Sequence, residues 1–318
     1  MALSDTERSR LDDAARAGWL YFIAGNTQDE IARKLHVSRA TAQRLVSLSL
    51  SERLITFRLE HPIAACMELE TRLKDRFDLQ HCQVVPADPA SNSPVVGAAE
   101  AAAAFLEARL RSPAPLIIAL GTGRMMRAAV EQIPAMDRAD HQLVSLVGNI
   151  SPDGSASFFD ALALLADLTK ARHFPMPLPV FLSSAGEREK LLRIDPVARV
   201  RNLAEKTDLR LVGIGQMDMN AQLHIDGFIT RDELFEMMHL GAVGEVTGWV
   251  FDAEGNVIDG GSNTRLTSIP IQKSPASLDV GVAIGLAKVP SIRAALKGRL
   301  LNGLITNETT AQALLNPG

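Results

Sequence analysis

Two short apolar stripes near the start of the chain follow the spacing of α-helices. Their apolar positions are Ile31, Ala32 and Leu35 in the first stripe, and Ala42, Leu45 and Val46 in the second. Each set falls on one side of a helix, and Ser38 stands where the second helix needs an N-cap. His36 and Val37 fill the turn, and histidine enters the left-handed backbone region more readily than most residues. The pattern therefore predicts a helix-turn-helix over residues 28–47.

The outer face of the second predicted helix carries side chains that suit DNA recognition. The candidate DNA-binding residues are Gln28, Ser38, Arg39, Ala40, Thr41, Gln43, Arg44 and Ser47. Arginine pairs with guanine edges or phosphates, glutamine pairs with adenine, and threonine or alanine contacts the thymine methyl group. Residues 33–58 hold six basic residues and one acidic residue, in a chain whose net charge is −4. A basic solvated face on an ordinary pair of helices is the alternative interpretation.

Beyond these helices, helical and extended patterns alternate along the chain. A short strand or wing is expected at 54–62, and a helix at 63–77 with Ala64, Met67, Leu73 and Phe77 on one side. Extended segments are then predicted at 83–85, 116–120, 142–147, 179–182 and 209–214, and helices at 97–110, 124–132, 156–170 and 196–205. Helices that follow strands in this way indicate a mainly parallel sheet covered on both faces. We therefore predict an α/β chain with a small N-terminal helix-turn-helix domain, residues 1–60, and a larger doubly wound domain, residues 61–318.

Composition narrows the class of protein. The 318 residues suggest about two domains, and a hydrophobic content of 47% fills a packed core, mostly with aliphatic side chains because aromatic residues make up only 4%. Trp19, Tyr21 and Phe22 are expected to pack inside the small domain. The polar first ten residues are unlike a signal peptide, and no apolar run approaches the roughly 18 residues of a membrane span. We expect a soluble, cytoplasmic protein.

Cysteine and histidine spacing gives no sign of metal chemistry. Cys66 and Cys82 lie sixteen positions apart and are expected to be reduced thiols. The seven histidines show neither HxH nor HExxH spacing, so the sequence predicts no metal site and no cofactor.

A glycine-rich turn follows the strand predicted at 116–120. Its residues are Gly121, Thr122, Gly123 and Arg124. Glycines let the backbone approach a ligand, and free amides, a hydroxyl and a guanidinium favour an anion or a polyhydroxyl compound. Strand-to-helix turns also need glycine for conformational reasons, so a purely structural role stays open. The chain lacks the pattern GxxxxGK[ST], which disfavours a nucleoside triphosphatase.

Other predicted strand ends place small residues beside polar side chains. Gly148 and Asn149 follow one strand, Gln216 follows another, and Glu245 precedes the extended segment 249–251. Asp252 either faces a ligand or closes the turn 252–256, and we favour the ligand. Parallel sheets bind ligands outside the carboxyl ends of their strands. These residues therefore join 121–124 as candidate effector contacts.

Five spaced segments match the motifs of one family. Residues 27–45 follow the pattern TQxEIAxxLxVSRxTxxRL, 121–124 follow the start of GxGRT, and 250–259 contain D-x-x-G. Near the end, residues 285–289 are similar to GGxxKxxAI and 304–308 to LITDE. On these motifs the chain resembles, nearly from end to end, the SorC family of sugar-binding transcriptional regulators.

The resemblance implies an effector domain related to sugar-phosphate isomerases and glucosamine-phosphate deaminases, kept as a sensor and not as an enzyme. It implies that 121–124 hold one end of the effector, and that Asp252 and Lys288 hold the other. Three positions depart from the family pattern, with Met125 in place of threonine, Ile284 in place of glycine and Asn307 in place of aspartate. Because methionine lacks the hydroxyl that helps to hold a phosphate, Met125 favours an unphosphorylated sugar or sugar alcohol.

Together these features predict a sequence-specific DNA-binding transcriptional regulator of carbohydrate or polyol catabolism. Its expected partners are operator DNA, a small sugar, polyol or sugar-phosphate effector, and further copies of itself in a homodimer or homotetramer. No catalytic residue and no membrane partner are predicted. One alternative is an isomerase-like enzyme in which Lys288, Asp252 and Glu245 perform acid–base chemistry. Another is a structural DNA-binding protein without an effector.

Overall fold

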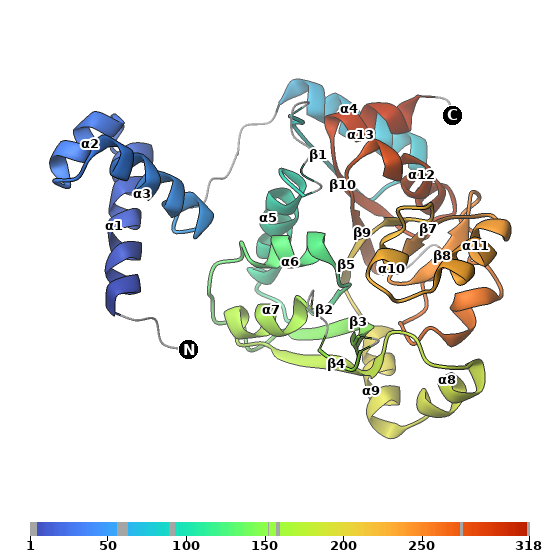
Figure 1. The fold of residues 1–318 in the computed structure, drawn as a ribbon. Helices are drawn as coiled ribbons and strands as arrows, with labels where there is room; N and C mark the ends of the chain where they lie inside the picture. The colour runs from blue at the N-terminus through green and yellow to red at the C-terminus, as the bar shows by residue number, and fades with distance from the viewer. Residues whose placement is uncertain are drawn as a thin grey trace. The chain divides into compact units, whose positions relative to one another are not determined.

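The computed structural model of the chain describes residues 5–55, 63–88, 93, 95–151, 153–156, 160–273 and 276–316 (Figure 1). The strand or wing expected at 54–62 lies outside these residues from position 56 onward. The chain divides into two compact units, Met1–Glu60 and His61–Gly318. In the part of the chain that is described, no helix is long and apolar enough to cross a membrane.

The first unit contains three helices, α1 (Asp5–Phe22), α2 (Gln28–Lys34) and α3 (Arg39–Ser51). Its buried core is formed by Ala17, Ile31, Ala42 and Val46. His36, between α2 and α3, has a positive φ of 55°. The two helices and the turn predicted from the apolar stripes are therefore present, and the stripes face the core as expected.

The aromatic residues of α1 differ from the expectation. Phe22 packs against the core of the unit, but the side chains of Trp19 and Tyr21 are 55% and 38% exposed. The face of α1 that meets α3 is made of small residues, because a Cβ at Gly18 would lie only 2.3 Å from Ser49 Oγ. The prediction that all three aromatic side chains pack inside was wrong, since small residues such as Gly18, and not Trp19 or Tyr21, face α3.

The second unit is built on a seven-stranded sheet in the order β1-β10-β9-β5-β2-β3-β4. Its strands are β1 (His81–Val85), β2 (Ile117–Leu120), β3 (Gln142–Ile150), β4 (Arg172–Pro179), β5 (Leu209–Gly213), β9 (Leu278–Val282) and β10 (Gly303–Asn307). All neighbouring strands in it are parallel, which confirms the predicted sheet. A smaller antiparallel sheet contains β6 (Gly215–Gln216), β7 (Ala242–Val246) and β8 (Trp249–Asp252).

Helices cover both faces of the large sheet (Figure 1). One core joins the sheet to α5 (Ala98–Leu110), α6 (Arg124–Val130) and α7 (Leu162–Thr169). The other joins it to α4 (Ala64–Phe77), α9 (Asp195–Ala204), α12 (Val289–Lys297) and α13 (Glu308–Leu315). The unit also contains the helices α8 (Ala185–Leu191), α10 (Gln222–Ile225) and α11 (Arg231–His239), and the 3₁₀ turns η1 (Gly261–Arg265) and η2 (Leu286–Lys288). The unit is doubly wound, as predicted.

The predicted boundaries of β4 and α7 were wrong. The strand expected at 179–182 is β4, which begins at Arg172 and ends at Pro179. Its three prolines are tolerated because β4 is an edge strand that pairs with β3 alone. The helix expected at 156–170 begins at Leu162, since Ala156 instead forms an antiparallel bridge with Ile150.

The buried face of α4 also differs from the prediction. Met67 is 50% exposed, whereas Cys66, Leu69 and Leu73 are buried against the sheet. Leu73 and Phe77 pack against the core as predicted, but the first half of the predicted stripe was wrong, because Ala64 and Met67 are exposed.

The order of the large sheet reverses between β2 and β5. After β2 the chain continues through β3 and β4 toward one edge, and after β5 it continues through β9 and β10 toward the other. Loops that leave two neighbouring parallel strands in opposite directions open a crevice at the carboxyl ends of these strands, where α/β proteins bind ligands. The topology therefore places the expected ligand site at the ends of β2 and β5.

Gly148, a predicted effector contact, lies inside β3 and not after it. A Cβ at this position would lie 2.5 Å from the carbonyl oxygen of Leu178 and 2.8 Å from the carbonyl carbon of Pro179. The glycine lets β3 and β4 approach closely where the register between them shifts. Gly148 therefore has a packing explanation.

We predict that Gly148→Ala destabilises the chain by about 2 kcal/mol, because the added methyl group would overlap backbone atoms, which cannot rotate away as a side chain can. Gly213→Ala, at the end of β5, is the matched control, since no atom lies within 4 Å of the Cβ that it would add. Urea unfolding of both variants measures the difference. Equal stability of the two variants would contradict the packing explanation.

Candidate functional site

A short chain of hydrogen bonds runs along the outer face of α3. Ser38 is the N-cap, and its hydroxyl accepts a hydrogen bond from the backbone N–H of Thr41 at 3.1 Å. The hydroxyls of Ser38 and Thr41 are 2.9 Å apart, and Arg44 Nη2 donates to Thr41 Oγ1 at 3.1 Å. The residues that start the helix therefore also orient an arginine one turn further along.

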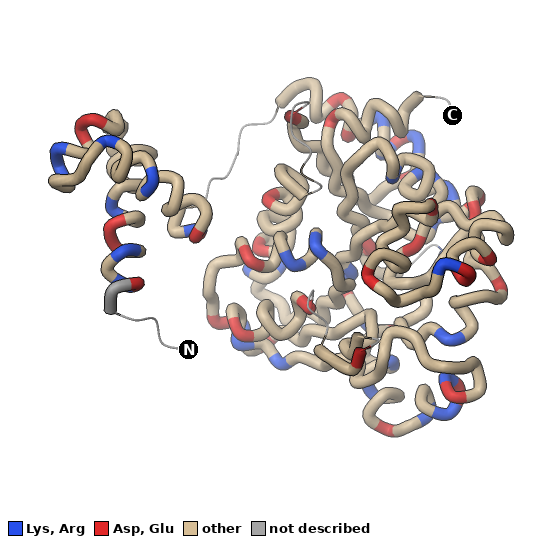
Figure 2. Tube along the Cα trace, in the orientation of Figure 1, with Lys and Arg blue, Asp and Glu red and all other residues tan. Residues whose placement is uncertain are grey.

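The predicted DNA-binding residues lie on the solvent side of α2 and α3. The exposed ones are Ser38, Arg39, Ala40, Gln43, Arg44 and Ser47, while Gln28 and Thr41 are half-buried. Arg39 pairs with Asp29 at 3.5 Å, and both side chains are well exposed, so the pair is weak and the guanidinium stays accessible. Figure 2 shows Lys and Arg segments on α2 and α3, with an acidic segment on α2. Since α3 contains Arg39 and Arg44 and no acidic residue, this helix carries the positive charge that attracts a phosphate backbone.

In the second unit, the turn 121–124 lies at the start of the crevice between β2 and β5. Gly121 N–H donates to the carbonyl of Leu211 in β5 at 2.9 Å. A Cβ at Gly121 would lie 3.4 Å from Val212 Cα and 3.5 Å from Thr247 Cγ2. Gly123 has a φ of 109°, which favours glycine. The two glycines thus bring the backbone close to β5 and to the loop that follows β7.

Arg124, the first residue of α6, makes a forked ion pair with Asp226. Arg124 Nη1 donates to Asp226 Oδ2 at 3.2 Å, and Nη2 donates to Oδ1 at 2.9 Å. Gln222 Nε2 donates to the same Oδ1 at 2.9 Å. Because Asp226 follows α10, the pair ties the turn after β2 to the layer of α10 and α11. Sequence reasoning missed Asp226 and Gln222, since no motif marks a partner 102 residues away.

Glu245 enters the crevice from β7. It lies opposite Gly215 of β6, where a Cβ would come within 2.1 Å of Glu245 Oε1, so the glycine leaves room for the carboxylate. Glu245 Oε2 accepts a hydrogen bond from Gly248 N–H at 2.8 Å. The carboxylate therefore also fixes the loop between β7 and β8.

Lys288, at the end of η2, adds a second cation to this cluster. Burial lowers its pKa, the charge of Arg124 lowers the pKa further, and the charge of Glu245 acts in the opposite direction. Burial likewise raises the pKa of Glu245, despite the Gly248 N–H and the charge of Lys288. Charged groups whose pKa values are shifted by burial and by each other in one crevice are typical of functional sites.

The structure gathers most of the predicted effector contacts at one edge of the sheet. The residues around the crevice are Gly121, Thr122, Gly123, Arg124, Glu245 and Lys288. Gln216 lies one residue after Gly215 in β6, and Asn149 lies near the carboxyl end of β3. Within the described residues, no group of three or more His, Cys, Asp or Glu side chains is arranged to hold a metal ion.

Asp252 lies apart from this cluster, at the end of β8 away from the loop 247–248. Its carboxylate accepts hydrogen bonds from the backbone N–H groups of Glu254 and Asn256 at 2.9 and 2.8 Å, and from Asn256 Nδ2 at 3.1 Å. These bonds close the turn 252–256, which is the alternative that the sequence left open. We therefore leave Asp252 out of the candidate effector site.

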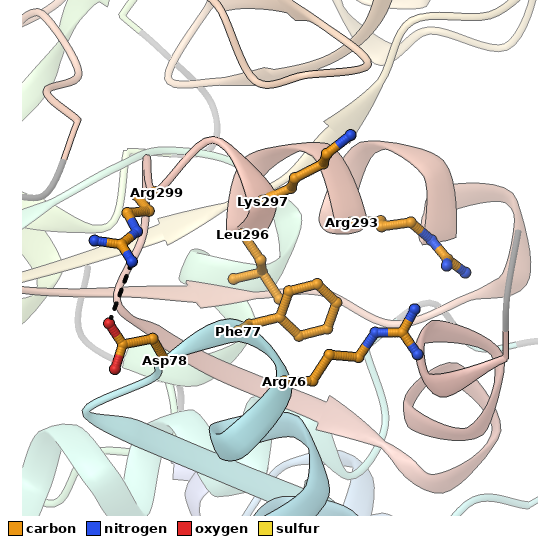
Figure 3. Close-up of a pocket in the computed structure, with 7 residues that line it drawn as sticks. All are labelled: Arg76, Phe77, Asp78, Arg293, Leu296, Lys297 and Arg299. Atoms are coloured by element: carbon orange, nitrogen blue, oxygen red, sulfur yellow. Dashed lines mark ion pairs between the residues drawn. The ribbon is translucent and has the colours of Figure 1, made fainter.

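A separate cavity of about 460 Å³ lies between the ends of α4 and α12 (Figure 3). Both helices lead into strands, so this cavity is at the amino ends of β1 and β10, on the edge opposite the crevice. Its arginines have structural partners. Arg76 and Arg293 donate to carbonyls at the end of α13, and Arg299 pairs with Asp78 at 3.6 Å. We do not place an effector there.

Known proteins are similar to this chain over nearly its whole length. Residues 61–316 match the family model described as "Putative sugar-binding domain". The chain is 34% identical over 302 residues to the erythritol catabolism regulatory protein EryD of Brucella abortus (strain 2308), which covers 95% of this chain and 96% of the relative. It is 29% identical to the transcriptional regulator LsrR of Escherichia coli (strain K12), over 99% of this chain and 98% of that protein.

The fold is similar to the crystal structure of the full-length sorbitol operon regulator SorC from Klebsiella pneumoniae. The TM-score is 0.72 at 24% sequence identity, covering 99% of this chain and 100% of that one. The chain belongs to the SorC family of sugar-binding transcriptional regulators.

Membership of the SorC family decides between the two main interpretations of the sequence. EryD, LsrR and the sorbitol operon regulator are transcriptional regulators and not enzymes. The chain is therefore a DNA-binding regulator, and the isomerase-like enzyme is not supported.

Asn307, which departs from the SorC pattern, caps α13 by accepting the Thr310 N–H at 3.0 Å, as an aspartate does.

We predict that Lys288→Met raises the stability of this SorC-family regulator at pH 7 in the absence of effector. Because burial lowers the pKa of Lys288 in the folded chain, the unfolded chain binds the proton more tightly, and the charged ammonium opposes folding. This cost falls as the pH rises from the folded pKa toward the ordinary lysine value of about 10.4. The gain should therefore be largest at pH values below the folded pKa of Lys288 and shrink as the pH approaches about 10.

Thermal unfolding across this pH range measures the effect. Lys170→Met is the control, since Lys170 lies in an exposed pair with Asp137 and its loss should give no gain. A Lys288→Met variant less stable than the wild type at pH 7 would mean that attraction to Glu245 outweighs the cost of burial.

Proposed function

We propose that this regulator binds a small uncharged polyol in the crevice between β2 and β5, and that the polyol controls the binding of α3 to operator DNA. The observation that supports this effector class is the balance of charge in the crevice. Among the described residues gathered there, Arg124 and Lys288 are matched by Asp226 and Glu245. A phosphate dianion needs positive charge that is not already matched, because its hydration is costly to remove.

A neutral polyol can form hydrogen bonds with all of these groups without needing an unmatched positive charge. Each hydroxyl both donates and accepts, so carboxylates, guanidinium groups and backbone amides all serve as partners for a neutral ligand. Met125 adds no hydroxyl of the kind that helps to hold a phosphate. The relative EryD is named for the regulation of erythritol catabolism, and erythritol is a four-carbon polyol without charge. We therefore propose a short polyol as the effector, with a sugar phosphate as the competing class.

Asp226→Asn tests the charge balance. Without the carboxylate, the charge of Arg124 is unmatched, so the affinity for erythritol 4-phosphate should rise about tenfold or more, equivalent to about 1.4 kcal/mol. The affinity for erythritol should change much less. Calorimetric titration of the full chain with both compounds gives the comparison.

Asp140→Asn is the matched control for this experiment. Asp140 forms a similar forked pair with Arg138 just before β3, at the opposite edge of the sheet, and its loss should change neither affinity. A wild-type chain that binds sugar phosphates more tightly than erythritol, xylitol and sorbitol would show that the proposed effector class is wrong.

On the DNA side, we propose that Arg39, Gln43 and Arg44 contact the operator. One recognition helix contacts too few base pairs for specific binding, so two copies of α3 in a homodimer or homotetramer are proposed to occupy successive major grooves. The polyol can change this binding only if its affinity differs between the DNA-bound and free states. The Arg124–Asp226 pair lies at the crevice and joins two layers of the unit, which makes it a contact that an occupant can alter.

Arg44→Ala should weaken operator binding by about 1–3 kcal/mol if Arg44 contacts a base. Gel-shift titration at fixed salt, on a duplex selected from random sequences by the wild-type chain, measures the loss. Arg10→Ala removes the same charge from an exposed position of α1 and serves as the control. An equal loss of operator affinity in the two variants would mean that Arg44 contacts no base and contributes only through its charge.

A further inference from the structure

The loop between β7 and β8 has a backbone conformation that its first residue rarely adopts. Val246 pairs with Trp249, so Thr247 and Gly248 form a two-residue hairpin loop. Their φ angles are 52° and 88°. Positive φ at both positions is the signature of a type I′ turn, in which asparagine followed by glycine is preferred. A β-branched residue at positive φ is an outlier, and such residues concentrate at functional sites.

Contacts on both sides hold the strained loop in place. Gly248 N–H donates to Glu245 Oε2 at 2.8 Å. A Cβ at Gly248 would lie 2.7 Å from Leu266 Cδ1. The γ-methyl carbon of Thr247 lies 3.5 Å from the position that a Cβ would take at Gly121. The loop is thus fixed between a residue of the charged cluster and the glycine turn after β2.

The hydroxyl of Thr247 has no partner among the described residues. Its Oγ1 is buried and makes no hydrogen bond in that part of the chain. The γ-methyl of the same side chain contacts the glycine turn, so Thr247 lies beside this turn. A buried hydroxyl without a partner carries the cost of lost hydration and calls for an explanation. Strain, an unpaired hydroxyl and a position at the crevice therefore coincide in a single residue.

We propose that Thr247 is a specificity-determining residue whose Oγ1 exchanges a hydrogen bond with a hydroxyl of the effector. This proposal rests on the proposed function, because it uses the crevice as the effector site. The type I′ turn points the threonine at the glycine turn, and Glu245 holds the turn. An effector hydroxyl supplies the hydrogen bond that the effector-free chain lacks. A ligand without a hydroxyl at that position leaves Thr247 unpaired, and this penalty gives discrimination.

The experiment compares Thr247→Val and Thr247→Ser in the full chain. Valine keeps the branched shape at the same backbone angles and removes only the hydroxyl, whereas serine keeps the hydroxyl and removes the methyl group. Calorimetric titration with erythritol should show about tenfold weaker binding for Thr247→Val and nearly unchanged binding for Thr247→Ser. Thermal unfolding without polyol should show that Thr247→Val is at least as stable as the wild type, because an unpaired buried hydroxyl has been removed.

Ser262→Ala is the matched control. Ser262 Oγ is also buried without a partner among the described residues, but it lies in η1, where the neighbouring Gly261 packs against Met237. Its loss should leave the affinity for erythritol unchanged.

The outcomes separate this proposal from the proposed function. Wild-type affinity in Thr247→Val would overturn the role of Thr247 and leave the polyol effector in place. A wild-type chain that binds neither erythritol nor erythritol 4-phosphate would overturn both. Binding of the phosphate alone, weakened about tenfold by Thr247→Val, would support Thr247 and overturn the polyol class. Lower stability of Thr247→Val with unchanged affinity would show that the hydroxyl has a structural role only.

Discussion

The reversal of strand order between β2 and β5 is the constraint on which the site depends. Every strand of the large sheet runs in the same direction, so the loops at their carboxyl ends lie along one edge. Helices cover both faces of the sheet, and the reversal opens this edge where the chain leaves β2 and β5 in opposite directions. The glycine turn, Glu245 and Lys288 come together there although they lie far apart in the sequence.

The crevice concentrates features that do not favour folding. Glu245 and Lys288 both have pKa values shifted by burial, and Thr247 has a strained backbone with an unpaired hydroxyl. Arg210, a buried charged residue elsewhere in the unit, has hydrogen-bond partners within the chain. Arg210 donates to Thr207 Oγ1 at 3.0 Å and to a backbone carbonyl at 2.9 Å, and it lies 3.8 Å from Asp279. The contrast agrees with the effector site proposed above, because stability alone would select satisfied or apolar groups.

Charged residues are distributed differently in the two units of this SorC-family regulator. The net charge of the chain is −4, but basic residues are concentrated in the helix-turn-helix segment, where they suit a phosphate backbone. In the second unit, cations and carboxylates are paired around the crevice, as in the Arg124–Asp226 contact. Charged residues are thus exposed along the helix-turn-helix, and around the crevice they are paired with opposite charges.

The sequence by itself determined the features that depend on neighbours along the chain. The helix-turn-helix was predictable because its stripe, its N-cap at Ser38 and its left-handed His36 are fixed within about twenty residues. The parallel sheet and the glycine turn were predictable for the same reason, since strand, turn and helix follow one another directly. The extent of β4 was not predictable from the local pattern. Its three prolines are tolerated only because β4 is an edge strand of the sheet.

Only the tertiary structure decided which side chains share the crevice. Asp226 meets Arg124 across 102 residues of chain, and Thr247 meets Gly121 from the loop after β7. Asp252 matched a family motif, yet its carboxylate is used by its own turn. Hydrogen bonds and burial depend on which strands are neighbours in the sheet. Spacing along the chain therefore identified the candidate residues, and the order of the strands selected among them.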